Sequence, residues 1–81
     1  VANLFGARFT GASFAYADLS RATATGAYFG GADFTGARLD GANLSGAELE
    51  TARGLTQAQL NTACGDASTL LPPGLRIPPC R

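Results

Sequence analysis

The chain of 81 residues contains no histidine, no lysine and no tryptophan. Without histidine or lysine the usual general bases are missing, and a Ser–His or Cys–His nucleophile is excluded. Asp40, Glu48 and Glu50 are the one acidic cluster, and we expect them to be solvated rather than paired as acid and base. We therefore interpret the chain as a non-enzyme, and expect no catalytic residue, cofactor, metal or small-molecule ligand.

An excess of one charge is also lacking, since six arginines balance six carboxylates. This balance gives no electrostatic reason to expect a nucleic-acid partner. No apolar run approaches the ~18 residues of a membrane span, and no signal peptide is found in the chain as given. We expect one soluble domain, or a mature one whose leader has been removed.

What the chain does have is alanine at every fifth position from Ala2 to Ala52. A larger apolar residue lies two positions after each alanine of the period up to Ala47, except after Ala22, where position 24 is alanine. In most repeats glycine lies a further two positions along the chain. A period of five suits neither a helix nor a flat strand, because successive large residues would point in different directions. It suits a chain that bends after each short extended piece, with glycine at the bends. The inward residues are then Leu4, Phe9, Phe14, Leu19, Phe29, Phe34, Leu39, Leu44 and Leu49.

Four such bends close a coil of twenty residues, and stacked coils form a solenoid with a rise of about 4.8 Å per coil. Residues n and n+20 then stack, which predicts an aromatic column through Phe9 and Phe29 and another through Phe14 and Phe34. Ala24 would leave a gap in its column, between Leu4 and Leu44. An Ala/Gly-rich linker is the alternative, but a linker has no reason to keep Leu or Phe in register.

The repeats 2–4, 17–19, 32–34 and 42–44 read Ala-Asn-Leu, Ala-Asp-Leu, Ala-Asp-Phe and Ala-Asn-Leu. This resembles the motif of the pentapeptide repeat family, roughly Ala-(Asp/Asn)-Leu-x-x, over about two thirds of the chain. The resemblance implies an all-β fold, a right-handed quadrilateral β-helix with four repeats per coil. The chain has repeats for about two and a half coils.

Function would have to lie on the outward positions, because the tube is too narrow and too filled for an interior ligand. Outward columns such as Asp18 with Arg38 suggest alternating-sign ladders on a solvated face. Phe5 and Tyr16 stand out, because they are aromatic where other outward residues of the repeats are small or polar. With Arg8 and Tyr28 they form the candidate interface.

The first coil begins with nothing ahead of it that could cover its edge. Val1 enters directly in repeat register, so the inward residues of this coil should face solvent or a partner. We expect that upstream residues have been removed or that something else covers this end. A second copy of the chain is one candidate, because it would meet the same surface around Phe5 and Tyr16.

After the repeats, Thr56 and Gln59 form a capping box and Leu55 with Leu60 a hydrophobic staple. These signals predict a helix from Gln57 to Cys64 that ends at Gly65 and covers the last coil. The tail from Asp66 to Arg81 contains four prolines and should run extended. We divide the chain into repeats (1–53) and a helix-and-tail cap (54–81) within one domain. The cap sequence resembles the segment that follows the repeats in many bacterial members.

Cys64 and Cys80 are the only cysteines, and we predict a disulfide between them. An even pair in a small chain indicates an oxidising compartment, so we expect a periplasmic or otherwise exported protein. Two buried free thiols in a cytoplasmic protein are the alternative. A metal site would lack half of its tetrahedral ligands.

Two functions remain open. The first is a structural or protein-interaction module, such as a small accessory subunit of a larger assembly, with a protein partner or with self-association through the first coil. The second is implied by the resemblance alone, because some pentapeptide repeat proteins imitate DNA and protect a type II topoisomerase. Such proteins are acidic, long rods, whereas this chain is neutral and short.

Overall fold

A β-turn at the end of each repeat sets the path of the chain in the computed structural model, which describes residues 3–80. The Ala7 N–H donates to the Leu4 carbonyl (3.1 Å), and the Ala12 N–H donates to Phe9 in the same way (3.0 Å). The third turn residue has a positive φ, 63° at Gly6 and 68° at Gly11, which glycine adopts without steric cost. The glycines of the repeat therefore lie at the bends, as the sequence predicts.

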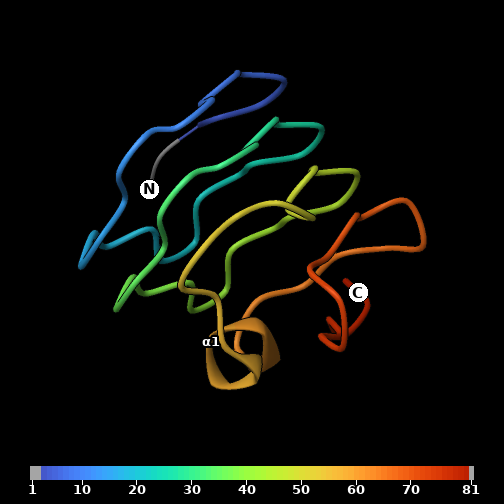
Figure 1. The fold of residues 1–81 in the computed structure, drawn as a ribbon. Helices are drawn as coiled ribbons and strands as arrows, with labels where there is room; N and C mark the ends of the chain where they lie inside the picture. Colours follow the sequence, from blue (N-terminus) through green and yellow to red (C-terminus); the bar gives the residue numbers. More distant parts are fainter. Residues whose placement is uncertain (1–2, 81) are drawn as a thin grey trace.

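The turns stack the chain into coils whose extended pieces pair in parallel (Figure 1). Each bridge within the repeats joins a residue to the one twenty positions later, as in Arg8 with Tyr28 and Tyr28 with Glu48. Four columns of bridges result, and each marks one side of the solenoid. In chain order they begin at Asn3, Arg8, Ser13 and Asp18.

The interior is filled by the alanines and by the larger residues two positions after them. Phe9 stacks on Phe29 with ring centroids 5.4 Å apart, and Phe14 stacks on Phe34 at 5.3 Å. Ala24 is buried in the same core. The large core residues of the second and third coils are buried, including Leu39, Leu44 and Leu49. Those of the first coil are half-buried: Leu4, Phe9, Phe14 and Leu19.

The helix α1 spans Gln57–Asn61 and begins with the predicted capping box of Thr56 and Gln59. It ends three residues earlier than the sequence suggests, at the C-cap Thr62, so Gly65 does not stop it. The reason is that Cys64 joins the ladder below Asn43, donating its N–H to the Ala42 carbonyl (2.9 Å). A residue cannot hold this extended pairing and continue the helix.

Residues 62–80 run beneath the last coil beside α1 (Figure 1). Cys64 and Leu70 extend two of the four columns, and Gly65 pairs with Pro79. Cys80 is joined to Cys64 by a disulfide with Cα atoms 4.8 Å apart. Leu60 of α1 packs in the core, together with apolar residues of this segment: Ala63, Leu71, Leu75 and Ile77.

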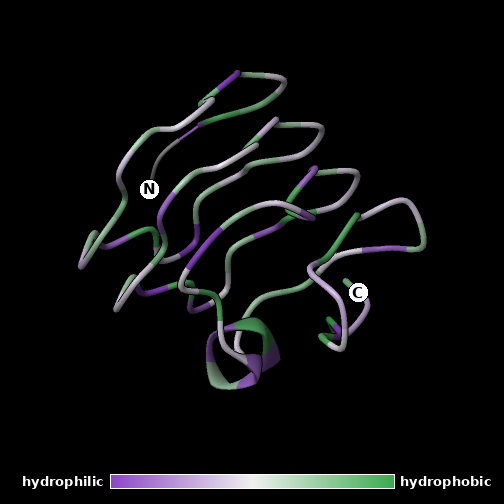
Figure 2. Ribbon diagram, viewed as in Figure 1, coloured by the Kyte–Doolittle hydropathy of each residue, from purple (hydrophilic) through white to green (hydrophobic). Residues whose placement is uncertain are grey.

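Hydrophobic and hydrophilic residues alternate along the coils, and both kinds occur on α1 (Figure 2). Within residues 3–80, α1 is too short to cross a membrane. The predicted entry of Val1 lies outside the described residues.

Candidate interaction surface

The order of the four columns decides which outward residues can be neighbours. Phe5 lies at the corner between the Asn3 and Arg8 columns, and Tyr16 lies at the corner between the Ser13 and Asp18 columns. These corners are diagonally opposite across the solenoid. Both side chains are strongly exposed, Phe5 at 70% and Tyr16 at 79%. Of the four candidate interface residues, Phe5, Arg8 and Tyr28 therefore lie together, whereas Tyr16 lies on the opposite part of the solenoid.

We call the side that carries Arg8, Tyr28 and Glu48 the Arg8 face. The Arg8 guanidinium lies over the Tyr28 ring, 5.4 Å from its centroid, in a cation–π contact. A groove of about 360 Å³ runs along this side, and Phe5 lies beside its first glycine. The groove is lined by Gly6, Arg8, Gly26, Tyr28 and Glu48.

The position of Tyr28 depends on Gly30, two residues along the chain. A Cβ atom at Gly30 would overlap the hydroxyl and ring carbons of Tyr28. Because Gly30 has no side chain, the Tyr28 ring can lie against the backbone there and leave the groove open towards Arg8. Gly30 has an ordinary φ, so close approach of the ring is its visible role.

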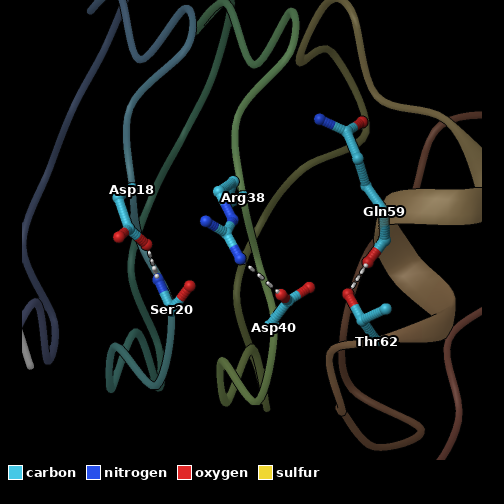
Figure 3. Close-up of polar contacts among 6 residues, drawn as sticks. All are labelled: Asp18, Ser20, Arg38, Asp40, Gln59 and Thr62. Atoms are coloured by element: carbon cyan, nitrogen blue, oxygen red, sulfur yellow. Dashed lines mark hydrogen bonds and ion pairs between the residues drawn. The ribbon is translucent and has the colours of Figure 1, made fainter.

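The Asp18 face, which carries Asp18 and Arg38, shows how the charged residues pair (Figure 3). Asp18 accepts a hydrogen bond from the Ser20 N–H (3.0 Å), and Arg38 forms an ion pair with Asp40 at 3.3 Å. The expected ladder of opposite charges between coils is not formed here, because each carboxylate bonds within its own coil. Both members of the Arg38–Asp40 pair are exposed, so this pair contributes little to stability.

The same local bond recurs at the polar residue that follows many of the alanines. Asp33 accepts from the backbone N–H (2.9 Å) and the hydroxyl (2.6 Å) of Thr35, and these bonds hold the pKa of Asp33 below its usual value. Hydrogen bonds from Ser20 lower the pKa of Asp18 in the same way. Asp66, which follows Gly65 after the repeats, forms a similar local bond, and its pKa is lowered chiefly by a hydrogen bond from Ser68.

Two corners of the first coil hold large residues at the turn position where most repeats place glycine. Tyr16 has φ 61° and Arg21 has φ 62°, and they are the non-glycine residues with positive φ in the described chain. The Tyr16 ring lies over Gly36 in the next coil, and the Arg21 stem lies over Gly41. Sequence reasoning selected Tyr16 for its exposure and missed Arg21. The signal was available, because positions 16 and 21 interrupt the run of glycines.

Of the acidic residues that cluster in the sequence, Asp40 lies apart from Glu48. Glu48 lies on the Arg8 face, whereas Asp40 lies at the corner beyond the Asp18 face and pairs with Arg38. Within residues 3–80, no group of three potential metal-ligating side chains comes together.

The profile of the family described as pentapeptide repeats matches the chain in eight copies, over residues 2–41 and 17–53. Among solved structures, the chain is similar to HetL, a pentapeptide repeat protein involved in heterocyst differentiation regulation from the cyanobacterium Nostoc sp.. The identity is 30% and the TM-score 0.39, over 86% of this chain and 36% of HetL. The chain thus spans about a third of the length of HetL. No match was found among curated proteins.

Proposed function

Because the chain belongs to the pentapeptide repeat family, we propose that it is a non-catalytic structural module that docks a partner protein on the Arg8 face. It would serve as a small accessory part of a larger assembly. A chain without histidine or lysine offers little to acid–base chemistry, which supports a binding role over a catalytic one.

The observation that carries this proposal is the arrangement around Tyr28. The Arg8 guanidinium lies over its ring, and Glu48 lies one coil further along the same groove. Aromatic residues and arginine are enriched at the centres of protein interfaces. The coil itself needs none of these outward side chains, because the inward residues and the turns define it.

The chemistry of the groove indicates the kind of surface that would bind. A partner would place an acidic group near Arg8, a basic group near Glu48 and an apolar group on Phe5, which is 70% exposed. Charges placed in this way would fix the orientation of the partner more than they would raise its affinity.

The architecture that presents this surface is a right-handed β-helix solenoid. In finer detail, we propose a quadrilateral cross-section and about two and a half coils in residues 1–53. We propose that residues 54–81 act as the cap of the same domain. The hydrogen bonds that residues 59–70 make with the last coil support the cap.

We also propose that the protein acts in an oxidising compartment such as a periplasm, with the cytoplasm as the alternative. The disulfide between Cys64 and Cys80 supports this, because such bonds persist outside the reducing cytoplasm. Thiol alkylation of the protein in its source cells tests it: alkylation of both cysteines without prior reduction would contradict the proposal.

Imitation of DNA is the weaker candidate. It would require a strongly acidic surface, whereas the chain has six basic and six acidic residues. An assay of DNA supercoiling by a type II topoisomerase tests it directly, and we expect no protection by the purified protein.

The interaction module is tested by affinity capture of partners from the source cells. Variants on the Arg8 face are compared with a variant at the opposite corner. Phe5→Ser and Glu48→Arg should each reduce recovery of the main partner by about tenfold, the loss expected for an interface residue worth ~1.4 kcal/mol. Tyr16→Ser is the matched control, because Tyr16 is an aromatic residue that is also strongly exposed, at the diagonally opposite corner. Undiminished capture by both Arg8-face variants, or loss only with Tyr16→Ser, would overturn the proposal.

A further inference from the structure

The column of outward residues on the Arg8 face continues below the third coil. Leu70 pairs with Glu48 as Glu48 pairs with Tyr28, and it donates its N–H to the Ala47 carbonyl (2.9 Å). Leu70 therefore takes the next outward place in this column, where its side chain is 43% exposed. From one end to the other, the column reads Arg8, Tyr28, Glu48 and Leu70.

The two ends of this face carry opposite charges, and each has an exposed apolar side chain. Arg8 lies on the first coil with Phe5 at the adjoining corner, whereas Glu48 lies on the third coil with Leu70 below it. Tyr28 lies midway between the two charges. Arg8 and Glu48 are two coils apart, roughly 10 Å, and do not form an ion pair within residues 3–80. Each charge is therefore available to a group outside the chain.

The other three sides of the solenoid do not have this symmetry. None of them places opposite charges at the bridge positions of the first and third coils. Those positions are Asn3, Thr23 and Asn43 on one side, Ser13, Asp33 and Arg53 on the next, and Asp18 and Arg38 on the last.

We propose that the partner docked on the Arg8 face is a second copy of the chain, an inference that rests on the proposed use of this face for docking. The two copies are related by a two-fold axis that runs along the strand direction at the level of Tyr28. This rotation reverses the order of the coils, so Arg8 of each copy faces Glu48 of the other. Phe5 of each copy then lies at the same end as Leu70 of the other, and the two Tyr28 rings lie at the centre.

Charge selects this arrangement over other two-fold pairings of the same face. An axis along the solenoid would keep the order of the coils and would oppose Arg8 to Arg8 and Glu48 to Glu48. Like charges opposed across an interface are unfavourable. An axis half a coil lower would place Arg8 against Leu70 and would leave neither charge facing its opposite.

The size of the face sets the expected strength of the dimer. The chain measures 28 by 28 by 19 Å, so one side offers roughly 500 Å² to a second copy. A standard stable interface buries about 800 Å² per partner. We therefore expect a reversible dimer that forms at high protein concentration and dissociates on dilution.

Sedimentation of the full chain over about 0.01–1 mM tests the proposal. The wild-type protein should shift from monomer to dimer over this range. Arg8→Glu and Glu48→Arg each oppose like charges, and each should raise the dissociation constant of the dimer by at least about tenfold. An equimolar mixture of these two variants should dimerise again, because every charge in the mixed dimer faces the opposite sign.

Arg38→Glu is the matched control, because it makes the same charge change on the opposite side of the solenoid. It should dimerise like the wild-type protein. It should not rescue Glu48→Arg, although it has the same net charge as Arg8→Glu. Circular dichroism of each variant checks that the fold is retained.

A wild-type chain that stays monomeric over the whole range, or a mixture of Arg8→Glu and Glu48→Arg that stays monomeric, would overturn the inference. Affinity capture separates this result from a failure of the docking function. If the wild-type chain is monomeric but captures a different polypeptide that is lost with Phe5→Ser and Glu48→Arg, only the second copy is excluded as the partner. A monomeric chain with undiminished capture by both variants would overturn docking on the Arg8 face as well.

Discussion

The side-chain amide of Gln59 donates hydrogen bonds to the carbonyl oxygens of Phe34 (2.8 Å) and Ala37 (2.9 Å). The same side chain accepts from the Thr56 N–H through Oε1 (2.7 Å), so it belongs both to the capping box of α1 and to the underside of the solenoid. Gln59 therefore ties the helix to a corner of the coil that has no further coil below it.

Replacing Gln59 by Glu should destabilise the protein by about 2–3 kcal/mol. The carboxylate can still accept from Thr56, but it cannot donate to the two carbonyls and it places negative charge against them. Urea denaturation followed by circular dichroism measures the loss. Ala58→Glu adds the same charge at an exposed position of α1 and should change stability by less than about 0.5 kcal/mol. Equal effects of the two substitutions would contradict the role given to the amide.

Glycine at position 16 or 21 should stabilise the fold. Tyr16 and Arg21 adopt positive φ, which costs a side chain about 1 kcal/mol or more, and glycine adopts it freely. Tyr16→Gly and Arg21→Gly should therefore each raise stability by up to about 1 kcal/mol. Ala15→Gly, in the same turn but at ordinary φ, should lower it by about 0.5–1 kcal/mol. A thermal melt of all three compares them, and destabilisation by both Tyr16→Gly and Arg21→Gly would refute the expectation.

Removal of the disulfide should weaken the protein as a whole. Cys64 and Cys80 are 16 residues apart, and a closed loop of this length stabilises by roughly 3 kcal/mol in the chain-entropy model. The variant in which both cysteines are replaced by serine should match the reduced wild-type protein in urea and should not respond to dithiothreitol. If reduction leaves the unfolding midpoint of the wild-type protein unchanged, the disulfide does not hold the C-terminal segment.

Acid should weaken the turns that contain Asp18, Asp33 and Asp66. Their pKa values are lowered in the folded chain from the usual 3.8, so the stability they confer is present above that value and is lost as the pH falls through the folded pKa. Thr35→Ala should raise the pKa of Asp33 towards its usual value, measured by carboxyl NMR titration. Thr25→Ala, at the equivalent place two columns earlier, should leave it unchanged. A pKa of Asp33 that is insensitive to Thr35→Ala would show that the hydrogen bonds are not its cause.

The sequence predicts the solenoid well because one period governs both the turns and the core. Alanine and the larger apolar residue fill the interior, and glycine permits the bend. Because residues twenty positions apart lie in the same column, the period also predicts the Phe9–Phe29 and Phe14–Phe34 stacks. The end of α1 could not be predicted from the sequence. Gly65 is a helix-stop signal, but the helix ends earlier because Cys64 pairs with Asn43, which is distant in the sequence.

Surface pairing was harder to predict. Opposite charges stacked twenty residues apart suggest ion pairs, yet Asp18 and Asp33 bond to groups two residues away. Such local bonds order fewer side-chain torsions than a pair of long, exposed side chains does. The separation of Phe5 from Tyr16 could have been derived by placing each residue at its corner, whereas the contact of Arg8 with Tyr28 depends on rotamers that the period does not fix.

The most direct test of the interaction module is site-specific photo-crosslinking in the source cells, with a photoreactive phenylalanine analogue at position 5 or at position 16. We predict that one partner polypeptide is crosslinked from position 5 and not from position 16, and that adding Glu48→Arg abolishes the product. Crosslinking of a partner only from position 16, or a product at position 5 that is unaffected by Glu48→Arg, would contradict docking on the Arg8 face.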